Sequence, residues 1–331
     1  MADPFTLQLH ITDACQLRCR HCYRDEPKTD LPLADLEWVL DDFRAFCESR
    51  LIPGRVTFAG GEPLLRLDDL LRLTKRAKKA GMQAHLLTNG ISLTADVAAA
   101  LKSAGCLRAQ VSIDGNAVLH DQLRGAGAYA RAVAALDTLS RARLPATVSM
   151  TLGAWNLSSL DEVIRLAQQH EARLFVSRFV PCGTGATLRD KLLPANEWRA
   201  VMRRCRALSR RHAPGVALRD PLYAPLRTRQ ERGHDLALAG CAVGHAGLAV
   251  EADGEAYACR RLAIPLGNVR TSGFESIWQS PLLDPLRDRD RLKGRCGACR
   301  RRWQCGGCRA IAHALTGDPL AADPQCPWSP H

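Results

Sequence analysis

Three cysteines near the N-terminus have a spacing that suits iron–sulfur chemistry. Cys15, Cys19 and Cys22 form a Cys-X3-Cys-X2-Cys pattern. Three thiolates on one short loop can bind three irons of a [4Fe–4S] cluster and leave the fourth iron open. A structural zinc site is the alternative, but such sites prefer four closed ligands, usually as paired Cys-X2-Cys knuckles. The spacing therefore favours a cluster with one open iron.

Seven further cysteines gather in the last third of the chain. They are Cys241, Cys259, Cys296, Cys299, Cys305, Cys308 and Cys326. The N-terminus has neither the basic segment nor the apolar segment of a secretory signal, so we expect a cytoplasmic protein with reduced thiols. Fourteen cysteines in a reducing compartment indicate metal ligation rather than disulfides. Two zinc knuckles are the alternative for this group.

The four remaining cysteines are scattered. Cys47 and Cys205 lie on apolar helical stripes, and Cys106 adjoins an expected strand, so all three are expected in the core. Cys182 lies on no such stripe and stands in a glycine-rich turn. It is a candidate metal ligand or hydrogen-atom donor, and a small residue in a turn is the alternative.

Composition excludes several classes of protein. The chain has 331 residues, of which 46% are hydrophobic and 24% charged, which is a globular balance and not that of a disordered chain. No apolar window approaches the ~18 residues of a membrane span. The net charge of +12 comes mostly from arginine, which forms clusters at 203–211 and 300–302. A solvated basic face explains them; an acidic partner is the alternative, and the lack of interleaved aromatics argues against nucleic acid.

The elements that must position the first cysteines alternate between strand and helix. Strands are expected at 7–12, 55–59, 83–88, 108–113, 146–152 and 173–180, and helices at 36–47, 65–79, 94–104, 128–141 and 158–170. Six β/α units call for a parallel sheet with its chemistry at the carboxyl ends of the strands. Because six units cannot close an eight-fold barrel, we expect an α/β fold with a partial (β/α)6 TIM barrel.

The rest of the chain divides into two further segments. We expect the barrel over 1–190, a helical, arginine-rich connector over 191–234, and a small Cys-rich domain over 235–331. A hairpin is expected at 248–257, around Asp253-Gly254.

The N-terminal motifs resemble those of the radical S-adenosylmethionine (SAM) enzymes. The resemblance rests on the Cys15 motif with Tyr23 directly after it, and on Gly60-Gly61-Glu62-Pro63, which is similar to the family's GGEP motif. It implies a [4Fe–4S] cluster on the three cysteines and SAM as cofactor. The implied SAM contacts are Tyr23, Gly60, Gly61, Glu62, Asn89, Ser112 and Arg178. A turn is the alternative for the Gly60–Glu62 motif, and a strand-ending turn is the alternative for Asn89 and Ser112.

The C-terminal cysteines resemble the SPASM domain, which implies two auxiliary iron–sulfur clusters, expected as [4Fe–4S]. By this resemblance one cluster takes Cys296, Cys299, Cys305 and Cys326, and the other takes Cys241, Cys259 and Cys308. The family's last pair is Cys-X3-Cys, whereas here Cys305 and Cys308 are separated by two glycines. That shorter form is similar to the branch of haem-biosynthesis enzymes and some peptide maturases.

The second auxiliary set lacks a fourth thiolate. Its last ligand could be His234, Asp235 or His245, or Cys182 from the end of the sixth strand. The alternative is an iron that stays open. Among these, we expect an open or non-thiolate site.

The implied activity is reductive cleavage of SAM to a 5′-deoxyadenosyl radical, which abstracts a hydrogen atom from substrate. The first hypothesis is oxidative modification of a ribosomally made peptide. About six residues precede the first expected strand, so leader capture is expected to need a separate leader-binding protein or another surface of this chain. The second is a small molecule, either a tetrapyrrole side chain or a sugar or aminocyclitol. Either needs a reductant such as flavodoxin or ferredoxin. A non-enzymatic iron–sulfur or nucleic-acid-binding protein is disfavoured by the GGEP motif.

Overall fold

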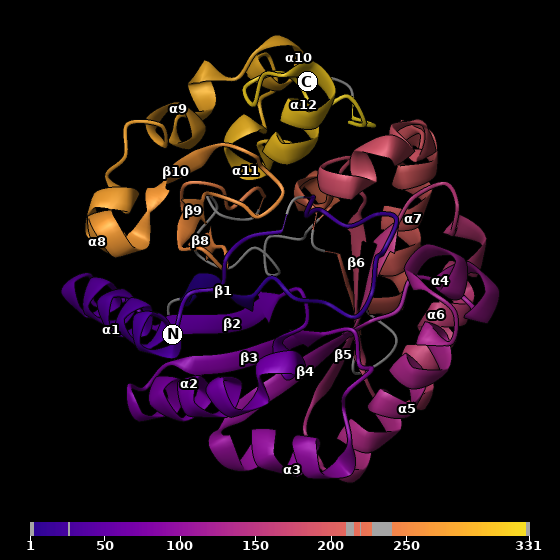
Figure 1. Cartoon of the computed structure of the whole chain (residues 1–331). Helices are drawn as coiled ribbons and strands as arrows, with labels where there is room; N and C mark the ends of the chain where they lie inside the picture. Colours follow the sequence, from indigo (N-terminus) through magenta and orange to yellow (C-terminus); the bar gives the residue numbers. More distant parts are fainter. Residues whose placement is uncertain (1–2, 26, 210–214, 219, 227–239, 329–331) are drawn as a thin grey trace.

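Six successive β/α units build the curved sheet that forms most of the molecule (Figure 1). The computed structural model describes residues 3–25, 27–209, 215–218, 220–226 and 240–328. The first six strands are β1 (Phe5–Thr12), β2 (Gly54–Gly60), β3 (Gln83–Thr88), β4 (Cys106–Ser112), β5 (Ala146–Leu152) and β6 (Arg173–Arg178). All neighbouring pairs among them are parallel, which confirms the expected partial barrel.

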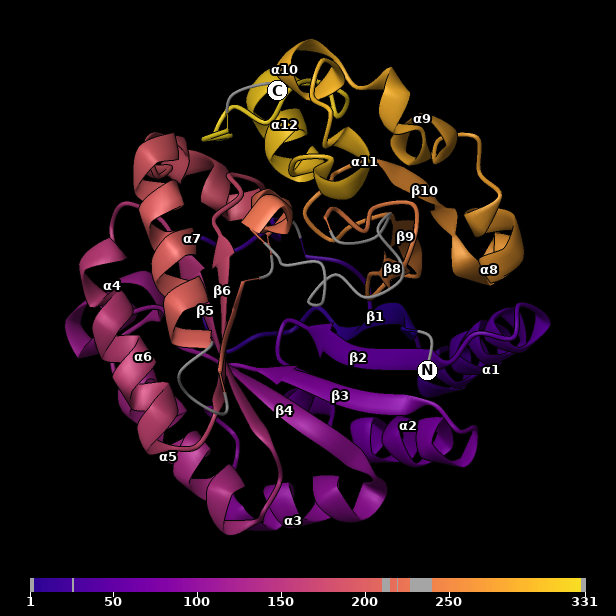
Figure 2. The ribbon, with the colours of Figure 1, turned by 180° about the vertical axis from the view of Figure 1, so that it is seen from behind.

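Helices cover the outer face of this sheet (Figures 1 and 2). They are α1 (Leu33–Ser49), α2 (Leu67–Lys79), α3 (Ala95–Ala104), α4 (Ala117–Arg124), α5 (Ala128–Arg141) and α6 (Leu160–Gln169). Most of them bury one apolar stripe, as α2 does with Leu70, Leu73 and Ala77 at helical spacing. Helix α4 was not expected; it begins at the Asn116 cap, whose side chain accepts from Leu119 N.

The segment after β6 differs from the helical connector that the sequence predicts. Helix α7 (Ala195–Ser209) is present, but β7 (Val216–Leu218) follows and pairs in parallel with β6. Arg210, Arg211, His234 and Asp235 lie outside the described residues. Cys47, Cys106 and Cys205 are buried in the core, as expected.

The Cys-rich segment continues the same sheet. Strand β8 (Gly247–Val250) pairs in parallel with β1, and β9 (Glu255–Tyr257) and β10 (Pro265–Asn268) add antiparallel beyond it. The hairpin predicted around Asp253-Gly254 is confirmed. The remaining helices, which lie over this end of the sheet in Figure 1, are α8 (Val269–Trp278), α9 (Asp284–Arg287), α10 (Gly294–Gly297), α11 (Arg302–Cys305) and α12 (Arg309–Thr316). No helix in the described ranges is long and apolar enough to cross a membrane.

Candidate active site

A cavity of about 680 Å³ lies at the carboxyl ends of the parallel strands. Chain segments that follow β1, β2, β3 and β6 line it together with the ends of β4 and β5. The predicted site residues that line it are Cys15, Cys19, Cys22, Tyr23, Gly60, Gly61, Asn89 and Ser112. The structure therefore brings together residues that are almost 100 positions apart in the sequence.

The loop of the first three cysteines is fixed by backbone bonds from other parts of the barrel. Arg20 N donates to Leu123 O at 2.9 Å, and Gly185 N donates to Cys22 O at 2.9 Å. Gly183 has a φ of 57°, and a side chain there would collide with the Tyr23 backbone, so only glycine permits this approach. The thiol of Cys15 is exposed and accepts from Leu17 N at 3.4 Å.

The first two glycines of the GGEP motif pack directly against the cysteine loop. Gly61 N donates to Thr12 O, and Glu62 N donates to Ala14 O, both at 2.8 Å. A side chain at Gly60 or Gly61 would collide with these carbonyls. Because neither glycine has a side chain, the backbone of the motif can lie directly against the backbone of the cysteine loop. Residues with side chains at these two positions could not pack this closely.

The Glu62 carboxylate faces the protein interior, behind the cavity wall. It is fully buried and accepts from Thr88 Oγ1 at 2.7 Å, Asn89 N at 2.7 Å and Leu64 N at 3.2 Å. Burial raises the pKa of Glu62, and these three donors oppose that rise. Its contacts join the end of β2 to the end of β3.

Asp114 is a buried carboxylate that contacts the cysteine loop through His21 and also binds Arg124. It is fully buried, with 2.6 Å from Oδ2 to Arg124 Nε and 3.1 Å to His21 Nε2. Burial alone would raise the pKa of Asp114, but the charge of Arg124 and the contact with the His21 ring outweigh it and hold the pKa well below its usual value. Arg124 Nη1 also reaches Cys19 Sγ at 3.8 Å. One carboxylate therefore positions a cation beside a cluster thiol.

Tyr23 and Asn89 both line the cavity. The Tyr23 hydroxyl lies 3.3 Å from His10 Nε2, and Arg260 lies 5.4 Å from the centre of its ring. Burial raises the pKa of Tyr23 to about 12, so its hydroxyl stays protonated. Asn89 Nδ2 lies 3.9 Å from Cys15 Sγ.

The structure adds lining residues that sequence reasoning missed. Gln110 stands two residues before Ser112 on β4, and Ser149 and Thr151 stand at alternate positions of β5. Successive side chains of a strand point to opposite faces, so polar residues two apart mark one face. This alternation of polar residues in the sequence could have identified Gln110, Ser149 and Thr151 as lining residues. Arg260 and Arg261 also line the cavity, and they follow directly after Cys259.

Arg178, which was expected among the SAM contacts, does not line this cavity in the structure. Its side chain is 2% exposed. It contacts Asp220 Oδ2 at 2.5 Å and Asp323 Oδ2 at 2.7 Å. Two buried carboxylates therefore occupy the guanidinium, which leaves it a role in joining β6 to the C-terminal segment.

Four C-terminal cysteines line one small cavity of about 50 Å³. They are Cys296, Cys299, Cys305 and Cys326, the set expected for one auxiliary cluster. Cys305 Sγ accepts from Gly307 N, and Cys296 Sγ from Asp323 N, both at 3.4 Å. Backbone N–H groups aimed at sulfur are the partners that thiolate ligands of a cluster need.

The other three auxiliary cysteines lie nearby. Cys241 N donates to Cys305 O at 3.0 Å, and Cys308 N donates to Asp323 Oδ2 at 2.8 Å. Cys182 is half-buried beside this group. Burial and the neighbouring Cys259 raise the pKa of Cys182 to about 11, although the charge of Arg261 opposes the rise. His245 is half-buried instead beside Arg287 and Arg289, which together with burial lower its pKa.

The donor set fits iron–sulfur clusters better than single metal ions. Across the described residues, no three His, Cys, Asp or Glu side chains gather closely enough to hold one ion. Zinc would need its ligands about 2.3 Å from one point. In a cluster each thiolate binds a different iron, so wider spacing is expected.

Comparisons with known proteins agree with this geometry. The Radical SAM superfamily model matches residues 9–167, and the SPASM model, an iron–sulfur cluster-binding domain, matches residues 241–305. An AdoMet-dependent heme synthase from Methanosarcina barkeri is 31% identical, with 99% of this chain and 97% of the relative covered. A mycofactocin maturase from Mycobacterium ulcerans is 33% identical, with 98% and 88% covered. The crystal structure of Streptococcus suis SuiB bound to S-adenosylmethionine superposes with a TM-score of 0.78 at 17% identity, with 98% of this chain and 77% of that chain covered.

Proposed function

Because this chain belongs to the radical SAM superfamily and carries a SPASM domain, it is a radical SAM enzyme, and we propose that it oxidatively modifies a carboxylate-bearing peptide. Its cofactors are SAM, one [4Fe–4S] cluster and auxiliary iron–sulfur clusters. When bound and reduced, they supply a 5′-deoxyadenosyl radical that removes a hydrogen atom from the substrate. The chain's own residues position both partners and keep the site dry.

The observation that carries the proposal is the pair Arg260 and Arg261 in the cavity of the cysteine loop. Arg260 Nη1 donates to Gln8 Oε1 at 3.0 Å, and Arg261 Nη1 donates to the Arg178 carbonyl at 3.1 Å. Within the described residues, neither forms an ion pair with an Asp or Glu. Burial and the neighbouring charge of Arg261 lower the pKa of Arg260. Two adjacent, half-buried cations without a carboxylate partner favour an anionic ligand between them.

The size of the cavity sets how a substrate can enter. About 680 Å³ lies within the usual range for one small ligand. SAM and a cluster must share this volume, so a substrate inserts one arm and keeps its bulk outside. An acidic side chain or the C-terminal carboxylate of a peptide is such an arm.

Within this proposal, each group of residues has a distinct task. Cys15, Cys19 and Cys22 hold the SAM-binding cluster, and Arg124 positions a charge beside Cys19. The backbone of Gly60 and Gly61 would hold the SAM amino group, and Tyr23, Asn89 and Ser112 would complete the SAM contacts, with Glu62 supporting the motif from behind the cavity wall.

The same proposal assigns the C-terminal cysteines to two auxiliary clusters. One takes Cys296, Cys299, Cys305 and Cys326, and the other takes Cys241, Cys259 and Cys308. We place the domain boundaries near residues 190 and 235. Cys182 retains its proposed role as a hydrogen-atom donor, since it lies near Cys259 and near Arg260 and Arg261, which line the cavity.

A second candidate is a tetrapyrrole with propionate side chains. The AdoMet-dependent heme synthase, whose similarity spans nearly the whole of both chains, favours it. A propionate is also a short anionic arm, so it would use the same two arginines. The two candidates therefore differ in what lies outside the cavity.

The test is substrate-dependent formation of 5′-deoxyadenosine by the reconstituted, reduced enzyme. A short acidic peptide encoded beside the gene should raise the rate over the substrate-free enzyme, and Arg260→Gln with Arg261→Gln should raise KM for it. Stimulation by a propionate-bearing tetrapyrrole and not by the peptide would replace the first candidate with the second. The conservative Arg260→Lys with Arg261→Lys pair should retain part of the effect, as expected for charge rather than packing.

A further inference from the structure

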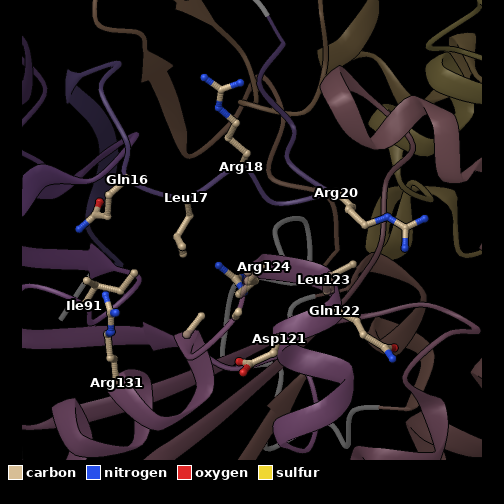
Figure 3. Close-up of a pocket in the computed structure, with 13 residues that line it drawn as sticks. Gln16, Leu17, Arg18, Arg20, Ile91, Asp121, Gln122, Leu123, Arg124 and Arg131 are labelled. Carbon is tan, nitrogen blue, oxygen red and sulfur yellow. The ribbon is translucent and has the colours of Figure 1, made fainter.

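A second cavity, of about 530 Å³, lies on the outer side of the cysteine loop (Figure 3). Residues 16–18 and 20 of the loop line one side of it, and the α4–α5 junction lines the other. Leu17, Arg18 and Arg124 line both this cavity and the one at the strand ends. The cysteine loop is therefore the wall between the two cavities. A molecule seated outside would be separated from the cluster by that loop alone.

The outer cavity is strongly basic. Arg18, Arg20 and Arg131 are exposed and surround Leu17 in Figure 3, and no carboxylate in the described ranges forms an ion pair with them. The one acidic lining residue, Asp121, accepts from Gly127 N and Tyr129 N at 2.7 Å each. Its charge is thus directed to the first amides of α5, which have no partner within the helix.

An apolar centre completes this surface. Leu17 is half-buried, and Figure 3 shows its side chain directed into the cavity, with Ile91 on the left edge. A small apolar centre with a charged rim is the usual construction of a protein-docking surface. Such charges mainly steer the encounter and select an oppositely charged partner.

We propose that this basic face, made by Leu17, Arg18, Arg20 and Arg131, docks an acidic electron-transfer protein of the flavodoxin type. The inference rests on the proposed function, since a radical SAM enzyme needs a reductant. The step is the transfer of one electron: the donor protein is oxidised by one electron and the cluster is reduced by one, with no bond formed or broken. Because the donor sits against the loop that holds Cys15 and Cys19, the electron crosses only that loop.

The test reverses two charges that face only the outer cavity. Arg20→Glu with Arg131→Glu is suitable, whereas Arg18 is left unchanged because it also lines the inner cavity. The matched control is Lys75→Glu with Arg141→Glu, which changes the net charge equally at exposed positions near the ends of α2 and α5. Both variants are studied as reconstituted enzyme.

Two readouts are needed, neither of which requires a substrate. Calorimetry with flavodoxin should give a Kd raised roughly tenfold or more by the Arg20/Arg131 variant, with the difference shrinking at high salt. The control should bind as wild type. SAM cleavage driven by flavodoxin should slow similarly, while cleavage driven by dithionite should not change, because that small reductant needs no docking surface.

Two results would overturn the inference. One is an unchanged flavodoxin Kd in the Arg20/Arg131 variant, and the other is an equal loss in the control variant. If the first comes with weakened binding of the acidic peptide, this face is instead a leader site. Arg131→Glu alone serves as a second variant, because Arg131 lies on α5 and its substitution should not disturb the cysteine loop. This single change should still weaken flavodoxin binding. Failure of the proposed substrate would leave these readouts unaffected.

Discussion

Arg178 and Asp323 form a buried ion pair, with 2.7 Å between Nη2 and Oδ2, across a sequence separation of 145 residues. Burial would raise the pKa of Asp323, but the charge of Arg178 outweighs it and holds the pKa below its usual value. Asp323 also accepts from Cys308 N at 2.8 Å, and its own N–H donates to Cys296 Sγ at 3.4 Å. Through its carboxylate and its backbone N–H, Asp323 thus contacts residues of both proposed auxiliary sets and the end of a barrel strand.

Asp323→Asn should destabilise the protein and lower its iron content. Removing one partner of a buried ion pair typically costs about 3–5 kcal/mol, because the remaining charge stays buried. Iron analysis and thermal unfolding of the reconstituted protein check this. Asp190→Asn is the control, since Asp190 forms an exposed pair with Lys191 and should have little effect. Full iron content in Asp323→Asn would contradict the assigned role.

Changing Cys15, Cys19 and Cys22 to Ala should abolish 5′-deoxyadenosine formation and leave iron at the C-terminal sites. The reason is that the two groups of cysteines line separate cavities. Iron counting and EPR of the reduced protein measure the remaining clusters. Cys47→Ala with Cys205→Ala, in the core, should keep full iron content. SAM cleavage by the triple variant would refute the assignment of these ligands.

Glu62→Gln should weaken SAM binding through the fold of the GGEP loop. The new amide group would place a donor against Asn89 N or Thr88 Oγ1, at a cost of about 1–3 kcal/mol. We therefore expect the melting temperature and the SAM affinity to fall together, the affinity by roughly ten- to a hundredfold. Equilibrium dialysis and thermal unfolding measure both. A loss of affinity without any loss of stability would instead indicate direct contact with SAM.

Acidification should destabilise the barrel through two buried histidines. Burial lowers the pKa of His10 to about 3 and that of His120 to about 4. The unfolded chain takes up these protons near pH 6.5, and the folded chain does so only at the lower values. Stability is therefore fully present above pH 6.5 and falls by about 1.4 kcal/mol per pH unit and per histidine below it. His10→Gln should flatten the decline in denaturation midpoint between pH 7 and 5, and His170→Gln serves as the control.

Cys182→Ala should leave the auxiliary EPR signals and the iron content unchanged. This follows from our expectation that the Cys241, Cys259 and Cys308 set has an open or non-thiolate fourth site. Loss of the corresponding cluster signal would make Cys182 its ligand. Cys182→Ser separates a ligand from a hydrogen-atom donor, since a donor's loss changes the product and not the cluster.

Local patterns in the sequence predicted the barrel well. Gln83–Thr88 and Ala128–Arg141 have the bounds that periodicity indicates, because each alternates or repeats over its full length. Strand β7 has only three residues, too few for a period to show. The pairing of β8 with β1 and the partners of Arg178 were missed for another reason. They join positions far apart in the sequence, and no local pattern encodes which distant segments meet.

Strand β8 has a consequence for how the chain can be divided. It covers the edge of β1 from Thr6 to Leu9, so residues 1–190 expressed alone would expose a row of unpaired backbone groups on the first strand. Such an edge is a template for intermolecular pairing. By pairing with this edge, the cysteine-rich segment also protects the barrel from aggregation. A different auxiliary domain fused to this barrel must therefore supply a strand that pairs with β1 in the same register.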